Sequence, residues 1–157
     1  MSDVRVFVSY DLEHDRELYA LIIAQSKTQS SGFVIVGSSE RPPAHLLCSE
    51  KTMNSIGEAN QVIVICGEHS ESSAGMSAEL QVAHQEGKPY FLLWGRREIM
   101  CSKPTGAKSS DGMYSWTLPI LQEQMELMKR SAKWKTPTDE FKSAAKNKRP
   151  AEDPPNA

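Results

Sequence analysis

Four short apolar runs, separated by stretches with helical patterns, constrain the fold of this 157-residue chain more than any other feature. The runs are rich in β-branched and aromatic residues and are mostly continuous. Such runs are typical of strands that helices cover on both faces. Turn-forming residues follow each run, which marks its end. The runs are Val4–Val8, Phe33–Val36, Val62–Cys66 and Tyr90–Trp94.

The stretches between the runs predict helices, and a short fifth strand is expected near Met113–Trp116. Alternating strands and helices imply right-handed crossovers and a parallel sheet. We therefore predict an α/β fold, a flavodoxin-like three-layer sandwich with a mostly parallel sheet in the order 2-1-3-4-5. The predicted helices span Leu12–Thr28, Ser49–Glu58, Ser72–Glu86 and Leu118–Lys133.

The net charge of −2 conceals a difference between two parts of the chain. Residues 1–128 contain 10 basic and 16 acidic side chains, whereas residues 129–157 contain 8 basic and 4 acidic ones. The second part also carries several prolines and too few apolar residues to offset the entropy of ordering. We predict a folded domain over residues 1–133 and a flexible, basic, proline-containing tail over residues 134–157. The tail is either a solvated segment without a task or a weak contact for an anionic partner.

Composition and motifs exclude several classes of protein. The slightly negative charge gives no reason to expect nucleic acid, and no apolar run approaches the roughly 20 residues of a membrane span. Three cysteines without a CxxC pair fit free thiols in a reducing cytosol, so we expect a cytoplasmic protein. The chain has no metal-ligand cluster, no GxSxG elbow, no P-loop and no GxGxxG fingerprint.

A ligand site is expected at one edge of the predicted sheet. In open parallel sheets, ligands bind outside the carboxyl ends of the strands, where the strand order reverses. Here that point lies between the first and third strands, with Gly37–Glu50 as one wall. The residues expected to bind a substrate are Ser9, Tyr10, Asp11, Ser38, Arg41, Gly67, Ser73 and Arg96.

Some of these residues have a second interpretation. Ser9 and Asp11 could instead begin the next helix as caps. Arg96 could hold a phosphate through two hydrogen bonds or belong to a solvated loop.

Glu79 is the most informative single residue of the predicted third helix. On a helix it lies about 60° from Met76 and about 40° from Ala83, at the edge of the apolar stripe. A half-buried carboxylate there could face a ligand. It could also reach solvent or pair with a neighbouring base, and helical position alone does not decide between these roles.

Three sequence segments resemble the TIR (Toll/interleukin-1 receptor-like) domain family. VRVFVSYD at Val4–Asp11 resembles the opening box, in which a strand ends in a Ser-Tyr stretch. NQVIVICGEHSESSAGMSAEL at Asn60–Leu80 resembles the third strand and third helix, and the following HQEGKPYFLLWG resembles the passage into the fourth strand. The resemblance spans roughly residues 3–130. Within the family, the chain is most similar to the short bacterial TIR-like proteins of Thoeris antiphage defence.

The resemblance implies an activity. Catalytic TIR domains cleave the bond between nicotinamide and ribose in NAD⁺, and Glu79 occupies the place of their catalytic glutamate on the third helix. NAD⁺ would then be a substrate, with no further cofactor. The resemblance also implies an ADP-ribose-derived signal, which can be cyclic, a separate effector protein that responds to it, and self-association through the loop after the second strand.

Two positions depart from the family pattern, and other functions stay open. Gly75 stands where many relatives have a tryptophan, and the loop after the second strand contains Arg41-Pro42-Pro43 in place of the usual motif. One alternative is a TIR-like interaction module without turnover. A second alternative is an enzyme similar to nucleoside deoxyribosyltransferases, which share a similar sheet and a catalytic glutamate.

Overall fold

The computed structural model describes the backbone of residues 3–142 and the side chains of residues 3–130. The chain divides into two units, Met1–Met125 and Glu126–Ala157. The sheet, the layers around it and the candidate site all lie in the first unit.

Five parallel strands form one sheet in the order β2-β1-β3-β4-β5. This order confirms the prediction of an α/β, flavodoxin-like fold. The fifth strand also lies where the sequence predicts it. The strands are β1 (Val4–Ser9), β2 (Phe33–Ser38), β3 (Gln61–Cys66), β4 (Tyr90–Trp94) and β5 (Met113–Ser115).

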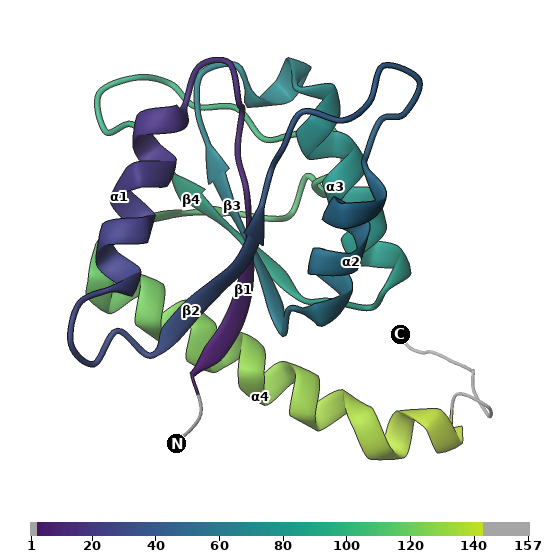
Figure 1. The fold of residues 1–157 in the computed structure, drawn as a ribbon. Helices are drawn as coiled ribbons and strands as arrows, with labels where there is room; N and C mark the ends of the chain where they lie inside the picture. Colours follow the sequence, from purple (N-terminus) through teal and green to yellow (C-terminus); the bar gives the residue numbers. More distant parts are fainter. Residues whose placement is uncertain (1–2, 143–157) are drawn as a thin grey trace. The chain divides into compact units, whose positions relative to one another are not determined.

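Helices cover both faces of the sheet (Figure 1). One face carries α1 (Arg16–Ser26), and the other carries α2 (Glu50–Glu58) and α3 (Ala74–Gln85). A single 3₁₀ turn, η1 (Ser70–Ser72), precedes α3. Serine side chains cap two of these helices, because Ser49 accepts the Thr52 N–H and Ser73 accepts the Met76 N–H.

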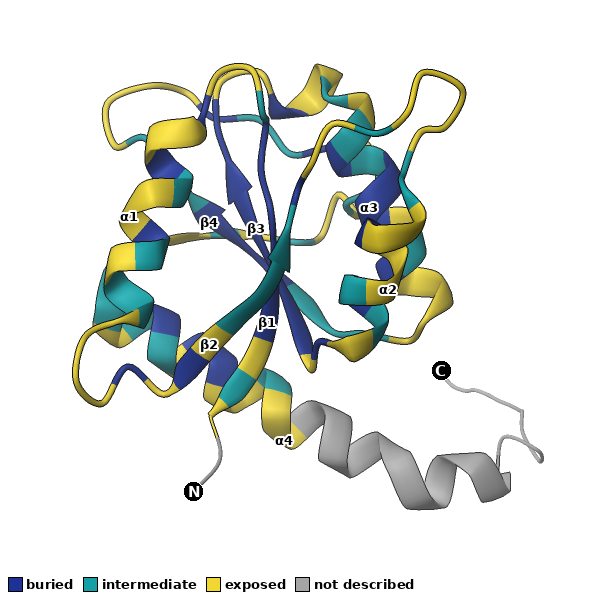
Figure 2. Ribbon diagram, in the orientation of Figure 1, coloured by how far each residue is buried: buried dark blue, intermediate teal, exposed yellow. Residues whose placement is uncertain are grey.

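Strand alternation divides the core between the two faces. On one face, Phe7, Val62 and Val64 pack with Ile56 of α2 and Leu80 of α3. Residues of the opposite parity in the same strands point to the other face and are also fully buried. The central strand β3 is buried along its whole length and is dark blue in Figure 2, as expected for a strand covered on both faces.

A β-bulge interrupts the pairing of β1 with the edge strand β2. Val6 pairs with Ile35, but Phe7 pairs with Gly37, so Val36 is an extra residue in β2. The bulge moves every later side chain of this strand to the opposite face. Ser38 therefore points away from α3, and the next residue points toward it.

The last helix, α4 (Leu118–Lys142), is longer than the predicted Leu118–Lys133. Its backbone continues past Lys133 to Lys142 even though this stretch contains Pro137 and two threonines, which are poor helix formers. Residues 143–157 of the predicted tail lie outside the described residues, so the tail stays a prediction. Among the described residues, no helix combines the length and the apolar composition that crossing a membrane requires.

Candidate functional site

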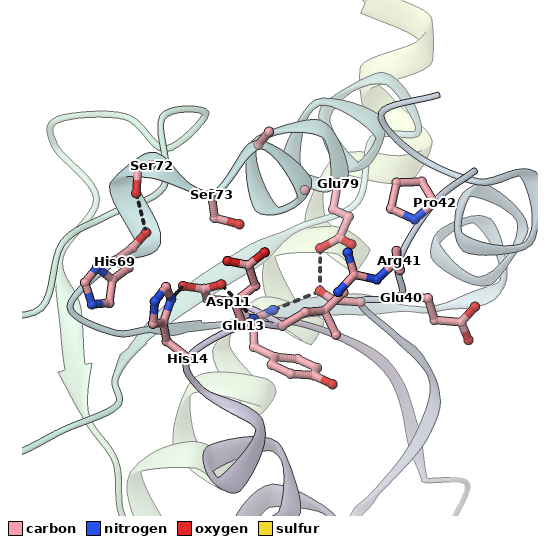
Figure 3. Close-up of a pocket in the computed structure, with 15 residues that line it drawn as sticks. Asp11, Glu13, His14, Glu40, Arg41, Pro42, His69, Ser72, Ser73 and Glu79 are labelled. Atoms are coloured by element: carbon pink, nitrogen blue, oxygen red, sulfur yellow. Dashed lines mark hydrogen bonds and ion pairs between the residues drawn. The ribbon is translucent and has the colours of Figure 1, made fainter. Parts of the chain in front are cut away.

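A cavity of about 260 Å³ opens at the carboxyl ends of β1 and β3, the edge of the sheet where the sequence predicts a site. Three segments form its wall: the loop after β1, the loop after β2, and the start of α3 with the turn before it (Figure 3). The lining residues are 10–14, 39–42 and 72–75, together with His69 and Glu79.

Glu79 projects from the middle of α3 into this cavity. Only 3% of the Glu79 surface is exposed, so the residue is buried more deeply than the half-buried position predicted from the helical pattern. One carboxylate oxygen, Oε1, accepts a hydrogen bond from the Ser9 hydroxyl at 2.7 Å and another from the Ser39 hydroxyl at 2.6 Å. Glu79 makes no ion pair with any of the described residues.

The electrostatic state of Glu79 follows from these contacts. Burial raises the pKa of Glu79 to about 7, because the charged form loses hydration. The hydrogen bonds from Ser39 and Ser9 oppose that rise. The side chain therefore titrates near neutral pH and gains a strong preference for any positive charge that enters the cavity.

Ser39 connects two walls of the cavity. Its hydroxyl donates to Glu79 and accepts the backbone N–H of Tyr10 at 2.9 Å. Its own N–H donates to the Val8 carbonyl, so the start of the loop after β2 is tied to the end of β1. Ser39, not the predicted Ser38, faces α3 because of the bulge at Val36.

The loop after β1 holds a second group of polar side chains. Asp11 is 6% exposed and accepts hydrogen bonds from the ring of His14 at 2.7 Å and from the Glu13 N–H at 3.1 Å. The His14 ring stacks on His69, with ring centroids 3.8 Å apart. The ring of Tyr10, which also lines the cavity, stacks on the ring of Tyr19, with ring centroids 4.8 Å apart.

Four of the other predicted residues divide between the cavity wall and the structure behind it. Arg41 and Ser73 line the cavity, and Ser73 is also the cap of α3. Gly67 lies behind the wall, where an added Cβ would come within 2.1 Å of Asp15. Arg96 also lies behind the wall, where its guanidinium pairs with Asp15 and Glu17 in place of the predicted phosphate.

Three residues of one short segment, at the end of the loop after β1 and the start of α1, fix the guanidinium of Arg96. It donates to Asp15 Oδ1 at 2.9 Å, to the His14 carbonyl at 2.9 Å and lies 3.1 Å from Glu17. Hydrogen bonds to Glu17 and Asp15 raise the pKa of Arg96 further. These contacts anchor the loop after β1 from behind.

The residues predicted to bind a substrate do not include Ser39, His14 or His69, although Ser39 lies in the loop predicted as one wall and His69 in the loop after the third strand. His14 follows Asp11 by three residues in a turn, a spacing that lets a carboxylate hold an imidazole. The predicted strand order places the loops after β1 and β3 beside each other, but no sequence pattern identifies His69 as the residue that meets His14. Within residues 3–130, no group of three or more His, Cys, Asp or Glu side chains is arranged to hold a metal ion.

The three cysteines are unpaired and contribute little reactivity. Burial raises the pKa of the Cys66 thiol to about 12 and that of the Cys48 thiol to about 11. Thiols with such pKa values stay protonated at neutral pH and are poor nucleophiles.

No family model matches the sequence, and no curated protein matches it. Among solved structures, the chain is similar to one described as the crystal structure of a prokaryotic SEFIR domain. The TM-score is 0.49 with 21% sequence identity, and the match covers 81% of this chain and 97% of that one. This similarity concerns the fold and assigns no role to any residue. The strand order and helix layers are those of the flavodoxin-like α/β fold that the sequence predicts.

Proposed function

We propose that this protein is a TIR-like NAD⁺ nucleosidase or cyclase that breaks the bond between nicotinamide and ribose. The observation that carries the proposal is the carboxylate of Glu79, which is buried at a cavity wall, accepts hydrogen bonds from two neutral hydroxyls and forms no ion pair with any described residue. An unpaired carboxylate in a site with little water favours a cationic ligand strongly. NAD⁺ carries its positive charge on the nicotinamide ring, at the bond that breaks.

The proposed chemistry needs a negative charge at one place. As the C1′–N bond breaks, its electron pair passes to the nicotinamide nitrogen, which leaves neutral, and positive charge moves to the ribose ring. Glu79 stabilises this oxocarbenium-like ribose from one face, as a fixed charge that requires no reorganisation. Water then attacks C1′ to give ADP-ribose, and attack by a nucleophile within the same molecule gives a cyclic product.

The size of the cavity supports one end of the dinucleotide as its occupant. At about 260 Å³ it lies just below the range of roughly 300–1,000 Å³ of small-molecule sites. It therefore suits nicotinamide and its ribose, while the diphosphate and adenosine would lie at the open side. Arg41 lines that cavity and is the cation we assign to the diphosphate.

The test compares Glu79→Gln with a matched control on the same cavity, Glu40→Gln. Glu40 lines the cavity but is partly exposed and pairs with Lys51 at 3.1 Å. Mass spectrometry after incubation with NAD⁺, with and without a phage-derived stimulus, identifies the products. We expect Glu79→Gln to lower nicotinamide release at least about 10³-fold. Glu40→Gln should change it by less than about threefold. Full turnover by a folded Glu79→Gln protein would exclude the mechanism.

The pH profile adds a second measurement. Glu79 acts in its ionised form, so the rate should rise with pH through about 7. A rate independent of pH between 5.5 and 8.5 would contradict a role for this carboxylate.

In the proposed role, the protein acts in antiphage defence. It associates with itself, and its product activates a separate effector protein. Leu46 and Leu47, in the loop after β2, are 41% and 69% exposed. Adjacent exposed leucines favour a protein contact at this loop. The same observation supports the alternative function, an interaction module without turnover. Sedimentation of Leu47→Ser against wild type tests the contact, and the NAD⁺ assay separates the two functions.

A further inference from the structure

The cavity contains a second titratable group that the proposed chemistry does not yet use. Asp11 and His14 lie 2.7 Å apart and line the same cavity as Glu79. Figure 3 shows His14 and His69 on one side of this cavity, and Glu79 with Arg41 on the other. The cavity therefore places a carboxylate and an imidazole on different sides of any ligand that fills it.

The Asp11 contact defines the protonation of the His14 ring. A carboxylate accepts hydrogen bonds and does not donate them, so the Nδ1 of His14 carries the proton. In the neutral ring, Nε2 is then the nitrogen with a free lone pair. The hydrogen bond to Asp11 also raises the pKa of His14, which makes Nε2 a stronger proton acceptor.

Two contacts hold the imidazole ring of His14, and a third holds its backbone. Asp11 is buried and is itself fixed by the Glu13 N–H. The ring of His69 stacks on His14 from the loop after β3, and Arg96 holds the His14 carbonyl at 2.9 Å. The ring is nevertheless accessible, because the His14 side chain is 46% exposed. An oriented imidazole that solvent can reach is suited to exchange protons with water.

We infer that His14, oriented by Asp11, is the base that activates the attacking water; this rests on the proposed function. As the water oxygen bonds to C1′ of the ribose, one water proton passes to Nε2 of His14. The product is ADP-ribose, and the imidazolium then releases the proton to solvent. Nicotinamide has already left with the electron pair of the broken bond, so the step requires no other reactant. Glu79 and His14 thus act on opposite faces of the sugar, as two groups do in inverting glycoside hydrolysis.

The experiment distinguishes the contribution of His14 from that of Glu79 by comparing two nucleophiles, water and 3-acetylpyridine. Water must lose a proton to form the product, whereas 3-acetylpyridine attacks C1′ through a nitrogen that carries none. Hydrolysis and pyridine exchange are measured side by side on the full-length chain with NAD⁺ and 3-acetylpyridine. The variants are His14→Gln, Glu79→Gln and, as a control outside the cavity wall, His84→Gln.

We expect His14→Gln to lower hydrolysis about 10²-fold while it keeps the exchange reaction. Glu79→Gln should abolish both reactions, and His84→Gln should change neither by more than about threefold. Imidazole added to His14→Gly should restore hydrolysis in proportion to its concentration, an effect that a purely structural role would not produce.

Three results would overturn the assignment. An equal loss of hydrolysis and exchange in His14→Gln would mean that His14 shapes or binds, and an unchanged hydrolysis rate would mean that it has no role. In both cases the function of Glu79 would stand. If wild-type protein releases no nicotinamide by either route, the proposed function fails and the base assignment fails with it.

Discussion

Glu79 and Asp15 are both buried carboxylates, with 3% and 1% of their surfaces exposed, but different partners hold them. Asp15 accepts two hydrogen bonds from the Arg96 guanidinium, at 2.9 and 3.3 Å. Glu79 accepts two from serine hydroxyls. Burial raises the pKa of both side chains, and only at Asp15 does a cation oppose that rise.

The difference separates a structural carboxylate from one that can act on a ligand. The charge of Asp15 is already compensated, and its contacts fix α1 and the loop after β1. The charge of Glu79 is solvated by neutral dipoles, so it stays available to a cation in the cavity. A buried charge without a counterion costs stability, and the protein retains it at the carboxyl ends of the strands, where ligands bind.

The largest change in the free energy of unfolding should come from removing the Arg96 guanidinium, the cation that pairs with Asp15. Arg96→Met leaves the buried Asp15 carboxylate without its partner, and we expect a loss of about 3–5 kcal/mol in the free energy of unfolding. Urea denaturation at pH 7.5 measures this, with the exposed neighbour Arg97→Met as control. Adding Asp15→Asn to Arg96→Met should recover part of the loss. If Arg96→Met is as stable as Arg97→Met, the ion pair between Arg96 and Asp15 does not stabilise the fold.

The next effect concerns the uncompensated carboxylate. Glu79 binds its proton with a pKa of about 7 in the folded protein and near its ordinary value of 4.5 in the unfolded chain. Between these values the folded state holds more protons, so stability falls as the pH rises from about 4.5 to 7. The fall amounts to about 3 kcal/mol.

Replacing Glu79 by glutamine should remove that cost. We expect Glu79→Gln to be more stable than wild type by about 2–3 kcal/mol at pH 8 and nearly equal to it at pH 4. Thermal unfolding of both proteins across this range provides the measurement. A constant difference at all pH values would show that Glu79 does not titrate with a raised pKa.

The smallest change in the free energy of unfolding should come from removing one of the two hydroxyls that donate to Glu79. Ser39→Ala removes a hydrogen bond to the Glu79 carboxylate, and we expect a loss of about 1–2 kcal/mol at pH 8. Because that bond lowers the pKa of Glu79, its loss should shift the rising part of the pH–rate profile to higher pH. Ser38→Ala is the matched control, since Ser38 faces the other side of the sheet. Equal pH profiles for the two variants would contradict the contact with Ser39.

The sequence predicted the architecture because the fold depends on repeated local patterns. The apolar runs, the positions of the helices and the order of the strands all follow from periodicity and from the rules for crossovers. The edge at which the cavity lies follows from that order alone. The angle of Glu79 on a helix that begins at this edge predicted that its side chain lies at the border of the apolar stripe, whereas its catalytic role came only from the resemblance to TIR domains.

The remaining details of the site depend on contacts between distant segments. Arg96 was expected to bind a ligand, and its neutralisation by Asp15 arises only once α1 packs beside the end of β4. The contact between His14 and His69 joins two loops that are adjacent only because β1 and β3 are neighbours. The predicted strand order makes these loops neighbours, but periodicity does not show which side chains meet between them.

The bulge at Val36 also has a consequence for how this chain should be aligned with others. The edge strand contains one residue more than its partner over the same length, so a gapless alignment with a relative that lacks the bulge would equate functional positions incorrectly by one. Ser38 would be matched with the residue that contacts the carboxylate, and Ser39 would seem to be an unrelated loop position. A correct comparison places a single-residue insertion at Val36, and any survey of which chains retain this serine depends on that gap.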